Sequence, residues 1–344
     1  MIERVAVVGA GSWGTTVASI SARNAPTVLW ARRKSLADVI NEQHCNLEYL
    51  STLHLDHSIE ATASLDEAAS GASLIVMAVP SHGFRPVLRG LAPHLAPGTP
   101  VLSLAKGLEQ GSNMRMTQVI GDELPGHPAG VLSGPNLARE IAVGQPAATV
   151  VAMSDEDVAA EIQSLLMTET FRVYTNPDVV GCEVAGATKN VLAIAAGIAK
   201  GLGLGDSSLA AMITRGLAEL GRLVVAMGGE PLTVAGLAGV GDLVATCTSQ
   251  LSRNRTVGEQ LGRGRKLDQI LAEMTMVAEG VKSARPLVDL ASGYDVEMPI
   301  GEQVADVLEE RCTPADVIPA LMSRAAKSEF HGFATPRRET RTHE

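Results

Sequence analysis

The stretch that decides the fold lies at the start of the chain and reads Val5-Ala6-Val7-Val8-Gly9-Ala10-Gly11-Ser12-Trp13-Gly14. Its first four residues are apolar, which predicts a buried strand, and a helical pattern follows directly over Thr15–Arg23. A glycine motif between a strand and a helix is typical of a dinucleotide-binding loop, and a purely structural glycine turn is the weaker alternative. Gly9 permits the tight turn, Gly11 lets the backbone approach a pyrophosphate, and Gly14 lets the helix lie close to the strand. The helix N-terminus then offers N–H groups to the phosphates.

The residues after the second predicted strand, Val28–Trp30, indicate which dinucleotide binds. A site that prefers NAD usually has an acidic residue there, which binds the ribose 2′-hydroxyl. This chain instead has Arg32, Arg33 and Lys34. Three cations favour the 2′-phosphate of NADP, although a solvated basic turn is the alternative. We therefore expect NADP(H) to be preferred, with NAD(H) also possible.

The rest of the chain predicts an α/β fold. Apolar runs that suit buried strands alternate with helical patterns, which indicates a Rossmann-type, doubly wound parallel sheet. From about Cys182 the strand signals fade and helical stretches follow, so we expect an all-α C-terminal domain. The further strand runs are Leu74–Val79, Val101–Leu104, Val131–Ser133 and Ala147–Ala152, and the helical stretches are Glu183–Lys200, Ser207–Met227, Asp242–Ser249, Val257–Leu261 and Leu267–Glu273.

The length of 344 residues suits two domains. We place the boundary near Asn176-Pro177, which gives an NAD(P)-binding Rossmann domain over 1–176 and a helical substrate-binding domain over 177–330. The residues of 331–344 are polar and charged, so they are predicted to form a tail.

The composition excludes several classes of partner. The net charge of −10 disfavours nucleic acid and anionic membrane surfaces, so a bound anion must be held by a local group of cations. We find no signal peptide, and the longest apolar helical run, Val191–Ala199, is far shorter than the ~20 residues that span a bilayer. The cytoplasm is the expected location. We expect reduced thiols and no metal site, because the spacing of Cys45, Cys182, Cys247, Cys312, His44, His54 and His57 forms no metal-binding or disulfide pattern.

Two lysines are candidates for the chemistry. Lys106 directly follows a predicted buried strand, at the sheet edge where ligands bind, although a surface lysine in a turn is the alternative. Lys189 lies in a helix that is almost wholly apolar, where desolvation lowers the pKa of an ammonium group toward the range of a general acid. The alternative for Lys189 is a lysine at the edge of a core helix whose charged end reaches solvent.

Two further segments carry polar residues at predicted helix starts. Asp242 is either a helix N-cap or a carboxylate that orients a catalytic ammonium. The segment Ser252-Arg253-Asn254-Arg255 is able to hold a phosphate through N–H groups, a hydroxyl and guanidinium groups, or it is an ordinary capped turn. Basic residues oppose the helix dipole at an N-terminus, which favours the phosphate.

With these residues placed, the sequence resembles the bacterial-type NAD(P)-dependent glycerol-3-phosphate dehydrogenases. The stretches that carry the resemblance run in the family's order over nearly the whole chain. They are Gly9–Thr15, Val79–Ser81, Lys106–Glu109, Ser133–Pro135, Lys189–Val191, Ile213–Gly216, Gly241–Leu243, Ser252–Arg255 and Val277–Gly280.

The resemblance implies reversible reduction of dihydroxyacetone phosphate to sn-glycerol 3-phosphate by NAD(P)H, which supplies glycerophospholipid synthesis. It implies that Lys189 is the proton donor, helped by Lys106 and Asp242. Family positions for substrate contacts fall on Lys106, Gly134, Asn136, Asp242, Ser252, Arg253 and Asn254. Those for the cofactor fall on Gly9, Gly11, Ser12, Trp13, Gly14, Arg32, Arg33, Lys106, Ala138, Arg253, Val277 and Glu279. Asn136 departs from the family, which usually has Ser or Thr there.

Two other functions stay open from the sequence. One is another β-hydroxyacid-type dehydrogenase with a phosphorylated or acidic substrate, which would share the Rossmann domain and the Lys-Asn helix. The other is a non-catalytic NADPH-binding regulator, which would need the glycine loop but not the two lysines and Asp242 together. We also expect a homodimer, because the helical domain is rich in Ala and Leu.

Overall fold

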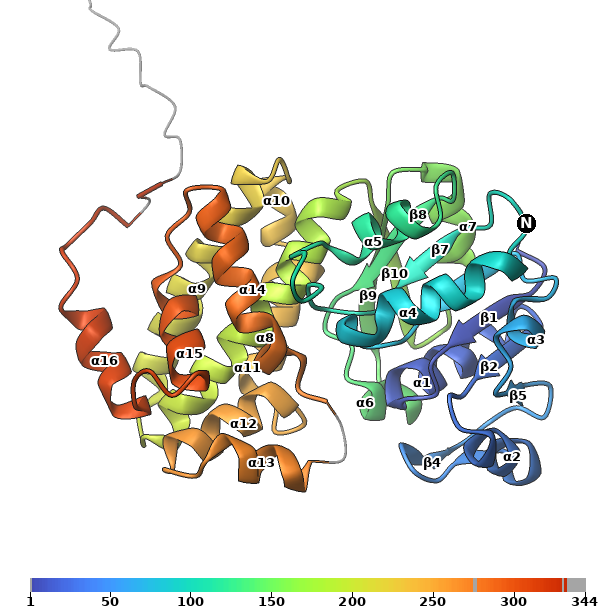
Figure 1. Cartoon of the computed structure of the whole chain (residues 1–344), viewed down its shortest axis with the longest axis horizontal. Coiled ribbons are helices and arrows are strands. Elements are labelled where there is room, and N and C mark those ends of the chain that lie inside the picture. Colours follow the sequence, from blue (N-terminus) through green and yellow to red (C-terminus); the bar gives the residue numbers. More distant parts are fainter. Residues whose placement is uncertain (1, 275–276, 330, 333–344) are drawn as a thin grey trace, which may run out of the picture.

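The protein has a sheet half and a helical half, which lie next to each other in Figure 1. The structure is a computed structural model, and it describes residues 2–274, 277–329 and 331–332. The predicted tail over 331–344 therefore lies outside the described residues from 333 onward.

The sheet half is built on eight strands in the order β10-β9-β8-β7-β6-β1-β2-β5. The six strands that the sequence predicts are all present, and the predicted fold class, a doubly wound sheet followed by a helical domain, is confirmed. Strands β1 and β6 are buried along their whole length, as expected for strands covered on both faces. The predicted strands are β1 (Val5–Val8), β2 (Thr27–Trp30), β6 (Leu74–Met77), β7 (Val101–Ser103), β8 (Ala129–Ser133) and β9 (Ala147–Met153).

One part of the sheet differs from the parallel arrangement, because β9 runs antiparallel to β8. The last strand, β10 (Phe171–Asn176), pairs with β9 in parallel. The segment between β8 and β9 holds only the short helix α6 (Ala138–Ala142), which packs against α1 (Ser12–Ser21). Such a short segment does not carry the chain back across the sheet, so β9 starts at the edge where β8 ends.

Strand β10 and three short strands were not predicted from the sequence. These are β3 (Cys45–Asn46) and β4 (Leu50–His54), which form a separate hairpin, and β5 (Glu60–Thr62) at one sheet edge. They are too short, or too polar, to give an apolar run. The helices that accompany the sheet are α2 (Lys34–Gln43), α3 (Leu65–Ala69), α4 (Ser81–Leu91), the 3₁₀ turn η1 (Ala92–His94), α5 (Met116–Glu123) and α7 (Glu156–Leu166).

The helical half is organised around α8 (Val179–Gly201), whose residues from Gly181 to Ala199 are all buried. The remaining elements are α9 (Asp206–Ala226), α10 (Pro231–Val234), the π turn η2 (Leu237–Gly241), α11 (Asp242–Thr248), α12 (Arg253–Gly262), α13 (Leu267–Glu273), α14 (Glu279–Gly293), α15 (Pro299–Leu308) and α16 (Pro314–Met322). Helix α8 contacts α9, α11, α12, α14 and α15. The five helical stretches that the sequence predicts correspond to α8, α9, α11, α12 and α13.

Helices α8 and α12 meet backbone to backbone. A Cβ atom on Gly197 of α8 would lie 2.0 Å from the carbonyl oxygen of Arg255, and one on Gly258 of α12 would lie 2.0 Å from that of Ile194. Any side chain at either glycine would force the helices apart. This glycine seam fixes the spacing of the two helices without the adaptability of packed side chains.

Two stretches are long and apolar enough, by length and composition, to cross a membrane. One is α8, and the other is the stretch Pro231–Thr248. The expectation that no apolar helix reaches this length was wrong, because the polar residues around Lys189 hid the full extent of α8. In the structure 89% of the apolar window of α8 is buried inside the protein, as in the core helix of a globular domain.

Candidate active site

The glycine loop lies between β1 and α1, as predicted. Gly9 has φ +128°, and a Cβ atom there would lie 2.6 Å from the carbonyl oxygen of Ala78. A Cβ atom on Gly14 would lie 1.9 Å from the carbonyl oxygen of Gly9. Gly11 faces open space, with no atom within 4 Å of the place where its Cβ would be. The loop thus has a rigid inner wall and an open outer face on which a phosphate is able to approach the backbone.

A hairpin that the sequence did not predict braces this loop. Asn46, on β3, is fully buried and donates to the carbonyl oxygen of Ala10 at 2.9 Å and to Oγ1 of Thr15 at 2.8 Å. The Ser12 hydroxyl donates to the carbonyl oxygen of Tyr49 at 2.8 Å. The β3–β4 hairpin therefore fixes the turn that leads into α1.

Of the three cations after β2, two have partners. Arg33 forms an ion pair with Glu48, and Lys34 pairs with Asp38 at 2.8 Å. Arg32 is exposed and, within the described part of the chain, makes no ion pair or side-chain hydrogen bond. Solvent screens exposed pairs of this kind, so they compete weakly with a bound phosphate. Arg32 is thus the cation most available to a ligand.

Lys106, Lys189 and Asp242 come together as a triad around a buried carboxylate, in which Lys106 is partly buried. Lys106 Nζ donates to Asp242 Oδ2 at 2.7 Å, and Lys189 Nζ donates to Asp242 Oδ1 at 2.6 Å. Asp242 is 1% exposed and Lys189 is 6% exposed. The alternatives of a surface Lys106 and an edge Lys189 are wrong, because both ammonium groups bind this buried carboxylate. The alternative of an N-cap Asp242 is wrong as well, because the N-cap of α11 is Gly241.

The triad combines two cations with one carboxylate in a desolvated place. Burial lowers the pKa of Lys189 to about 8, against the opposing attraction of Asp242. Burial acts to raise the pKa of Asp242, but the ammonium groups of Lys106 and Lys189 hold it below its ordinary value. Lys189 is thus poised to exchange a proton near neutral pH while Asp242 stays charged.

Two residues of this site were not assigned a role from the sequence. Thr246, one turn after Asp242, accepts from Lys189 Nζ at 2.8 Å. Asn190 donates to the main-chain oxygen of Lys106 at 2.8 Å and accepts from Asn254 Nδ2 at 2.9 Å. The sequence did contain a signal for each residue. Asn190 is a polar residue beside Lys189 in an apolar helix, and Thr246 places a hydroxyl four residues after Asp242, on the same helix face.

The ends of the sheet strands and the helical half are also linked through Glu279, the first residue of α14. Its carboxylate accepts from the main-chain N–H groups of Ser81 and Lys106, both at 3.3 Å. The side-chain oxygen of Asn254 accepts from the N–H of Gly280 at 3.0 Å. The predicted cofactor residue Glu279 and the predicted substrate residue Asn254 therefore both lie close to the triad.

The predicted phosphate segment forms the first turn of α12. Ser252 is the N-cap of this helix and accepts from Arg255 N at 3.2 Å, so its hydroxyl has the ordinary capping role that the sequence left open. Arg253 is exposed and donates to the main-chain oxygen of Val277 at 2.7 Å. Asn254 is buried. The structure thus places Arg253 beside the predicted cofactor residue Val277.

The remaining predicted residues lie at the ends of β8 and α6. Gly134, with φ +136°, accepts from Lys106 Nζ through its carbonyl oxygen at 2.8 Å. Asn136 donates to Thr149 Oγ1 at 3.0 Å, and its side-chain oxygen is buried without a partner among the described residues. Ala138 begins α6, and its carbonyl oxygen lies 3.4 Å from the Thr16 hydroxyl.

Comparison with known proteins decides the family. The family model for the N-terminus of NAD-dependent glycerol-3-phosphate dehydrogenase matches residues 4–159, and the model for its C-terminus matches residues 178–319. The chain belongs to the NAD-dependent glycerol-3-phosphate dehydrogenase family. It is an oxidoreductase that depends on NAD(P).

Individual members of the family agree with this membership over nearly the whole chain. The glycerol-3-phosphate dehydrogenase [NAD(P)+] 2 of Sphingopyxis alaskensis is 52% identical over 328 residues, which is 95% of this chain and 98% of that protein. That of Mycobacterium avium is 52% identical over 330 residues, or 96% of this chain and 97% of that protein. The crystal structure of glycerol-3-phosphate dehydrogenase from Coxiella burnetii superimposes with a TM-score of 0.90 at 36% identity and covers 94% of this chain and 99% of that one.

A protein that is not named as a glycerol-3-phosphate dehydrogenase has a similar fold. A ketopantoate reductase from Ralstonia eutropha matches with a TM-score of 0.60 at 17% identity, covering 92% of this chain and 99% of that one. At this identity the likeness concerns the fold alone. The Rossmann half followed by a helical half therefore does not by itself distinguish the substrate.

Proposed function

We propose that the enzyme reduces dihydroxyacetone phosphate to sn-glycerol 3-phosphate, reversibly, with NADPH as the preferred reductant, and thereby supplies glycerophospholipid synthesis. The observation that carries this proposal is the pair of ammonium groups, Lys106 and Lys189, held on one buried carboxylate. They lie at the carboxyl end of the sheet, the edge on which the glycine loop after β1 also opens.

The residues present fit a dinucleotide. Gly11 leaves its side of the loop open to a pyrophosphate, and the buried indole N–H of Trp13 has no partner among the described residues, so it is able to donate to a bound group. When bound, the cofactor supplies the hydride that reaches C2 of the ketone. We propose that Gly9, Gly11, Ser12, Trp13, Gly14, Arg32, Arg33, Lys106, Ala138, Arg253, Val277 and Glu279 contact it.

In the proposed mechanism the protein stabilises the charge that develops on the carbonyl oxygen. Lys189 donates the proton to this oxygen, and Lys106 adds a second positive charge. Asp242 orients both ammonium groups. We propose that the substrate is held by Lys106, Gly134, Asn136, Asp242, Ser252, Arg253 and Asn254, with the α12 turn on its phosphate.

The test of the function is the loss of NADPH absorbance on addition of dihydroxyacetone phosphate, repeated with NADH. Rapid oxidation supports the proposed reaction. If neither cofactor is oxidised, the proposal is wrong, and a panel of hydroxyacids then tests the related dehydrogenase activity. Tight NADPH binding without turnover of any ketone would instead favour the regulator.

Replacement of Arg32 by alanine is expected to raise KM for NADPH about tenfold or more, because a charge-assisted hydrogen bond contributes about 1.5–3 kcal/mol. KM for NADH should change little, since NADH lacks the 2′-phosphate. The matched control is Lys34→Ala, because Lys34 pairs with Asp38 and should not hold the phosphate. Equal effects on both cofactors would remove Arg32 from the 2′-phosphate site.

Replacement of Arg253 by alanine is expected to raise KM for dihydroxyacetone phosphate about tenfold or more through loss of a guanidinium–phosphate contact. Steady-state kinetics at saturating NADPH measures this KM. Arg263→Ala is the control, because Arg263 follows the opposite end of α12 and pairs with Glu259. A KM equal to that of the wild type would show that Arg253 does not hold the phosphate.

The pH dependence of the two directions should be opposite. Reduction needs the ammonium form of Lys189, so kcat/KM for reduction is expected to fall as the pH rises through about 8. Oxidation of glycerol 3-phosphate needs the neutral amine and should rise over the same range. Profiles of kcat/KM in both directions measure this. A reduction rate that increases through this range would contradict the role of Lys189.

We also propose that the enzyme is a cytoplasmic homodimer with a Rossmann domain over 1–176, a helical domain over 177–330 and a tail over 331–344. The end of β10 at Asn176 and the start of α8 at Val179 support the boundary. The Ala- and Leu-rich helical half supports the dimer. Sedimentation equilibrium tests it, and a monomer mass at micromolar concentration would contradict it.

A further inference from the structure

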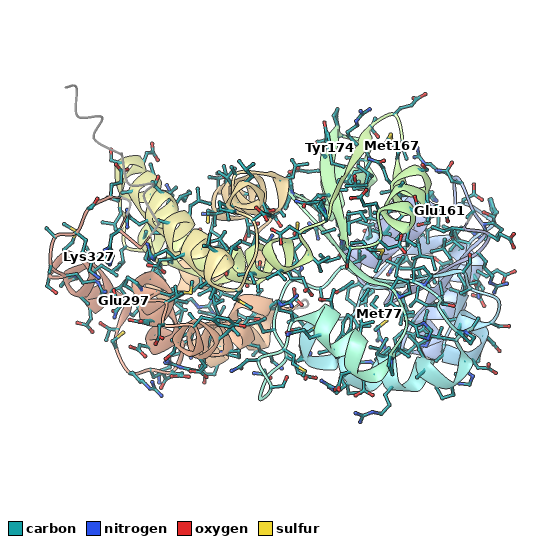
Figure 2. All side chains as sticks on the ribbon, turned by 90° about the horizontal axis from the view of Figure 1, so that it is seen from above. Met77, Glu161, Met167, Tyr174, Glu297 and Lys327 are labelled. Atoms are coloured by element: carbon teal, nitrogen blue, oxygen red, sulfur yellow. The ribbon has the colours of Figure 1, made fainter. Side chains whose placement is uncertain are left out.

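A cavity of about 960 Å³ lies in the helical half, between α8, α9, α15, α16 and the segment that follows α16. Among the described residues, none of the proposed catalytic, substrate or cofactor residues lines it. Glu297 and Lys327, which do line it, lie at the end of the molecule away from Met77 and the sheet (Figure 2). The cavity is therefore separate from the proposed active site.

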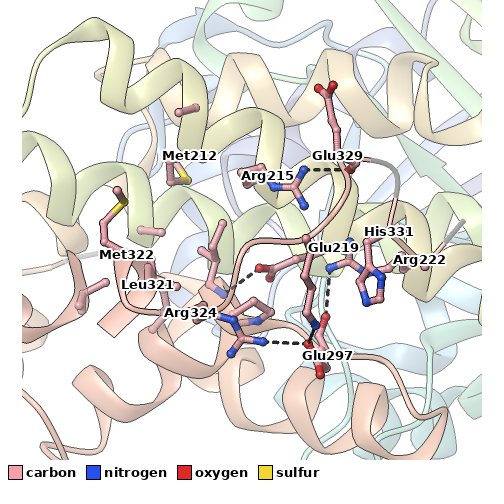
Figure 3. Close-up of a pocket in the computed structure, with 18 of the residues that line it drawn as sticks. Met212, Arg215, Glu219, Arg222, Glu297, Leu321, Met322, Arg324, Glu329 and His331 are labelled. Atoms are coloured by element: carbon pink, nitrogen blue, oxygen red, sulfur yellow. Dashed lines mark hydrogen bonds and ion pairs between the residues drawn. The ribbon is translucent and has the colours of Figure 1, made fainter. Parts of the chain in front are cut away.

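Two arginines face this cavity from one side of α9. Arg215 and Arg222 are seven residues apart, which places them two turns apart on the same face of the helix. Arg215 Nη1 donates to the main-chain oxygen of Glu329 at 3.1 Å, and Arg222 Nη2 donates to that of Glu297 at 3.2 Å (Figure 3). In the described part of the chain neither forms an ion pair with a carboxylate. The carboxylate of Glu329 points away from Arg215, and Asp295 is exposed.

The other charged groups of the cavity do not form ion pairs with these two arginines among the described residues. Glu297 accepts from both Arg324 and Lys327, each at 2.8 Å, so one carboxylate serves two cations. The carboxylate of Glu219 is buried and accepts from the N–H of Ile300 at 2.8 Å. Burial raises the pKa of Glu219 to about 7, so it is only partly charged at neutral pH. The described lining thus holds four cations and four carboxylates, but only Glu297 among these carboxylates forms an ion pair with lining cations, so the two arginines of α9 remain free to bind an anion.

The remaining wall of the cavity is apolar. It is formed by Met212, Val225, Ile318, Leu321 and Met322. Val225 is 44% exposed and Met322 is 79% exposed, which is unusual for large apolar side chains beside a cavity unless something covers them. An arginine pair and an apolar wall thus meet in a single open cavity.

We propose that this cavity binds an amphiphilic anion, that is, a single apolar chain that carries a carboxylate or a phosphate. The head group binds Arg215 and Arg222, and the chain lies against the wall formed by Met212, Leu321 and Met322. The volume is near the upper end of the ~300–1,000 Å³ of ligand pockets, which suits a molecule larger than the substrate. Arg215 belongs to the stretch Ile213–Gly216, which the proposed active site does not use. The proposal goes beyond the catalysed reaction and does not depend on it.

Four probes, titrated into the full-length enzyme by isothermal calorimetry below their micelle concentrations, test the ligand class. Oleate and 1-oleoyl-glycerol 3-phosphate carry the chain with a carboxylate or a phosphate, whereas monooleoylglycerol is uncharged and inorganic phosphate has no chain. We expect at least one of the two anions to bind at least tenfold more tightly than both partial probes. The tighter anion identifies the source of the head group.

Three variants locate the site. The double variant Arg215→Gln/Arg222→Gln should weaken binding of the tighter anion at least tenfold. Ala211→Trp, at an exposed lining position of α9, should do the same by filling the cavity without removing a charge. Arg311→Gln is the matched control, because Arg311 is exposed and does not line the cavity, and it should bind like the wild type.

Several results would overturn the proposal. These are no binding of either anion, equal binding of the uncharged probe, or displacement of the anion by dihydroxyacetone phosphate, which would place it in the active site. Unchanged binding by both the double variant and Ala211→Trp would also overturn it. A change in sedimentation coefficient for Ala211→Trp would show that a second copy of the chain, not a small ligand, covers this face.

Discussion

Replacement of Lys189 by alanine is expected to lower kcat for reduction of dihydroxyacetone phosphate by at least ~10²-fold, because the variant loses its general acid. The affinity for NADPH should be nearly unchanged, since the glycine loop lies on β1 and α1. Stopped-flow single-turnover kinetics measures the chemical step, and quenching of intrinsic fluorescence measures NADPH binding.

The matched control for this variant lies on the same helix. Lys200, near the C-terminal end of α8, is exposed, and Lys200→Ala should keep the wild-type kcat. Retained NADPH binding shows that Lys189→Ala is folded. A wild-type kcat in folded Lys189→Ala would end the assignment of Lys189 as the proton donor.

Replacement of Asp242 by alanine is expected to lower the free energy of unfolding by about 3–5 kcal/mol, because Lys106 and Lys189 would be left in a buried site without their carboxylate. It should also abolish most of the activity. Urea unfolding measures the first effect and steady-state kinetics the second. The half-buried pair of Asp306 and Arg285 provides the control. Arg285 also pairs with Glu309, so Asp306→Ala leaves that cation with a partner and should destabilise the protein much less than Asp242→Ala.

The loss in Asp242→Ala should also depend on pH. Burial lowers the pKa of Lys189, so the folded variant binds this proton less readily than the unfolded chain does. The variant also lacks the attraction of Asp242 that opposes this lowering. The unfolded state therefore holds more protons, and the stability of the variant should recover as the pH rises from the lowered pKa of Lys189 in the folded variant toward its ordinary value of 10.5. A destabilisation that is the same at all pH values would show that it comes from lost packing and not from uncompensated charge.

The parts of the site that could be predicted are those in which one residue conflicts with its local sequence. Lys189 interrupts an apolar helix and Lys106 ends a buried strand, so each indicated function by itself. The pairing of Arg33 with Glu48 could not be predicted, because it depends on the path of the β3–β4 hairpin, whose strands are too short to give a signal. Asn190 binds Lys106, which follows β7, and Asn254 of α12. This role could not be predicted, because it depends on the tertiary arrangement that brings both segments to α8.

The fold was predictable to a similar extent. The buried strands and the long helices follow from apolar runs, which report burial directly. The reversal at β9 does not, because a buried strand has the same composition whichever way it runs. The cavity beside Arg215 was equally hidden, since its wall is assembled from α9, α16 and the segment after α16.

The glycine seam between α8 and α12 has a consequence for substrate choice. Helix α8 carries Lys189, and the first turn of α12 carries Arg253, the proposed phosphate residue. Gly197 and Gly258 have no side chains that could adjust the spacing of the helices. Main-chain contact therefore sets the distance between the proposed proton donor and the proposed phosphate-binding residue. The fixed spacing of the two helices therefore sets the length of substrate that can reach both residues. A methyl group added at the seam would move the helices apart, and the enzyme would then be expected to prefer a longer substrate.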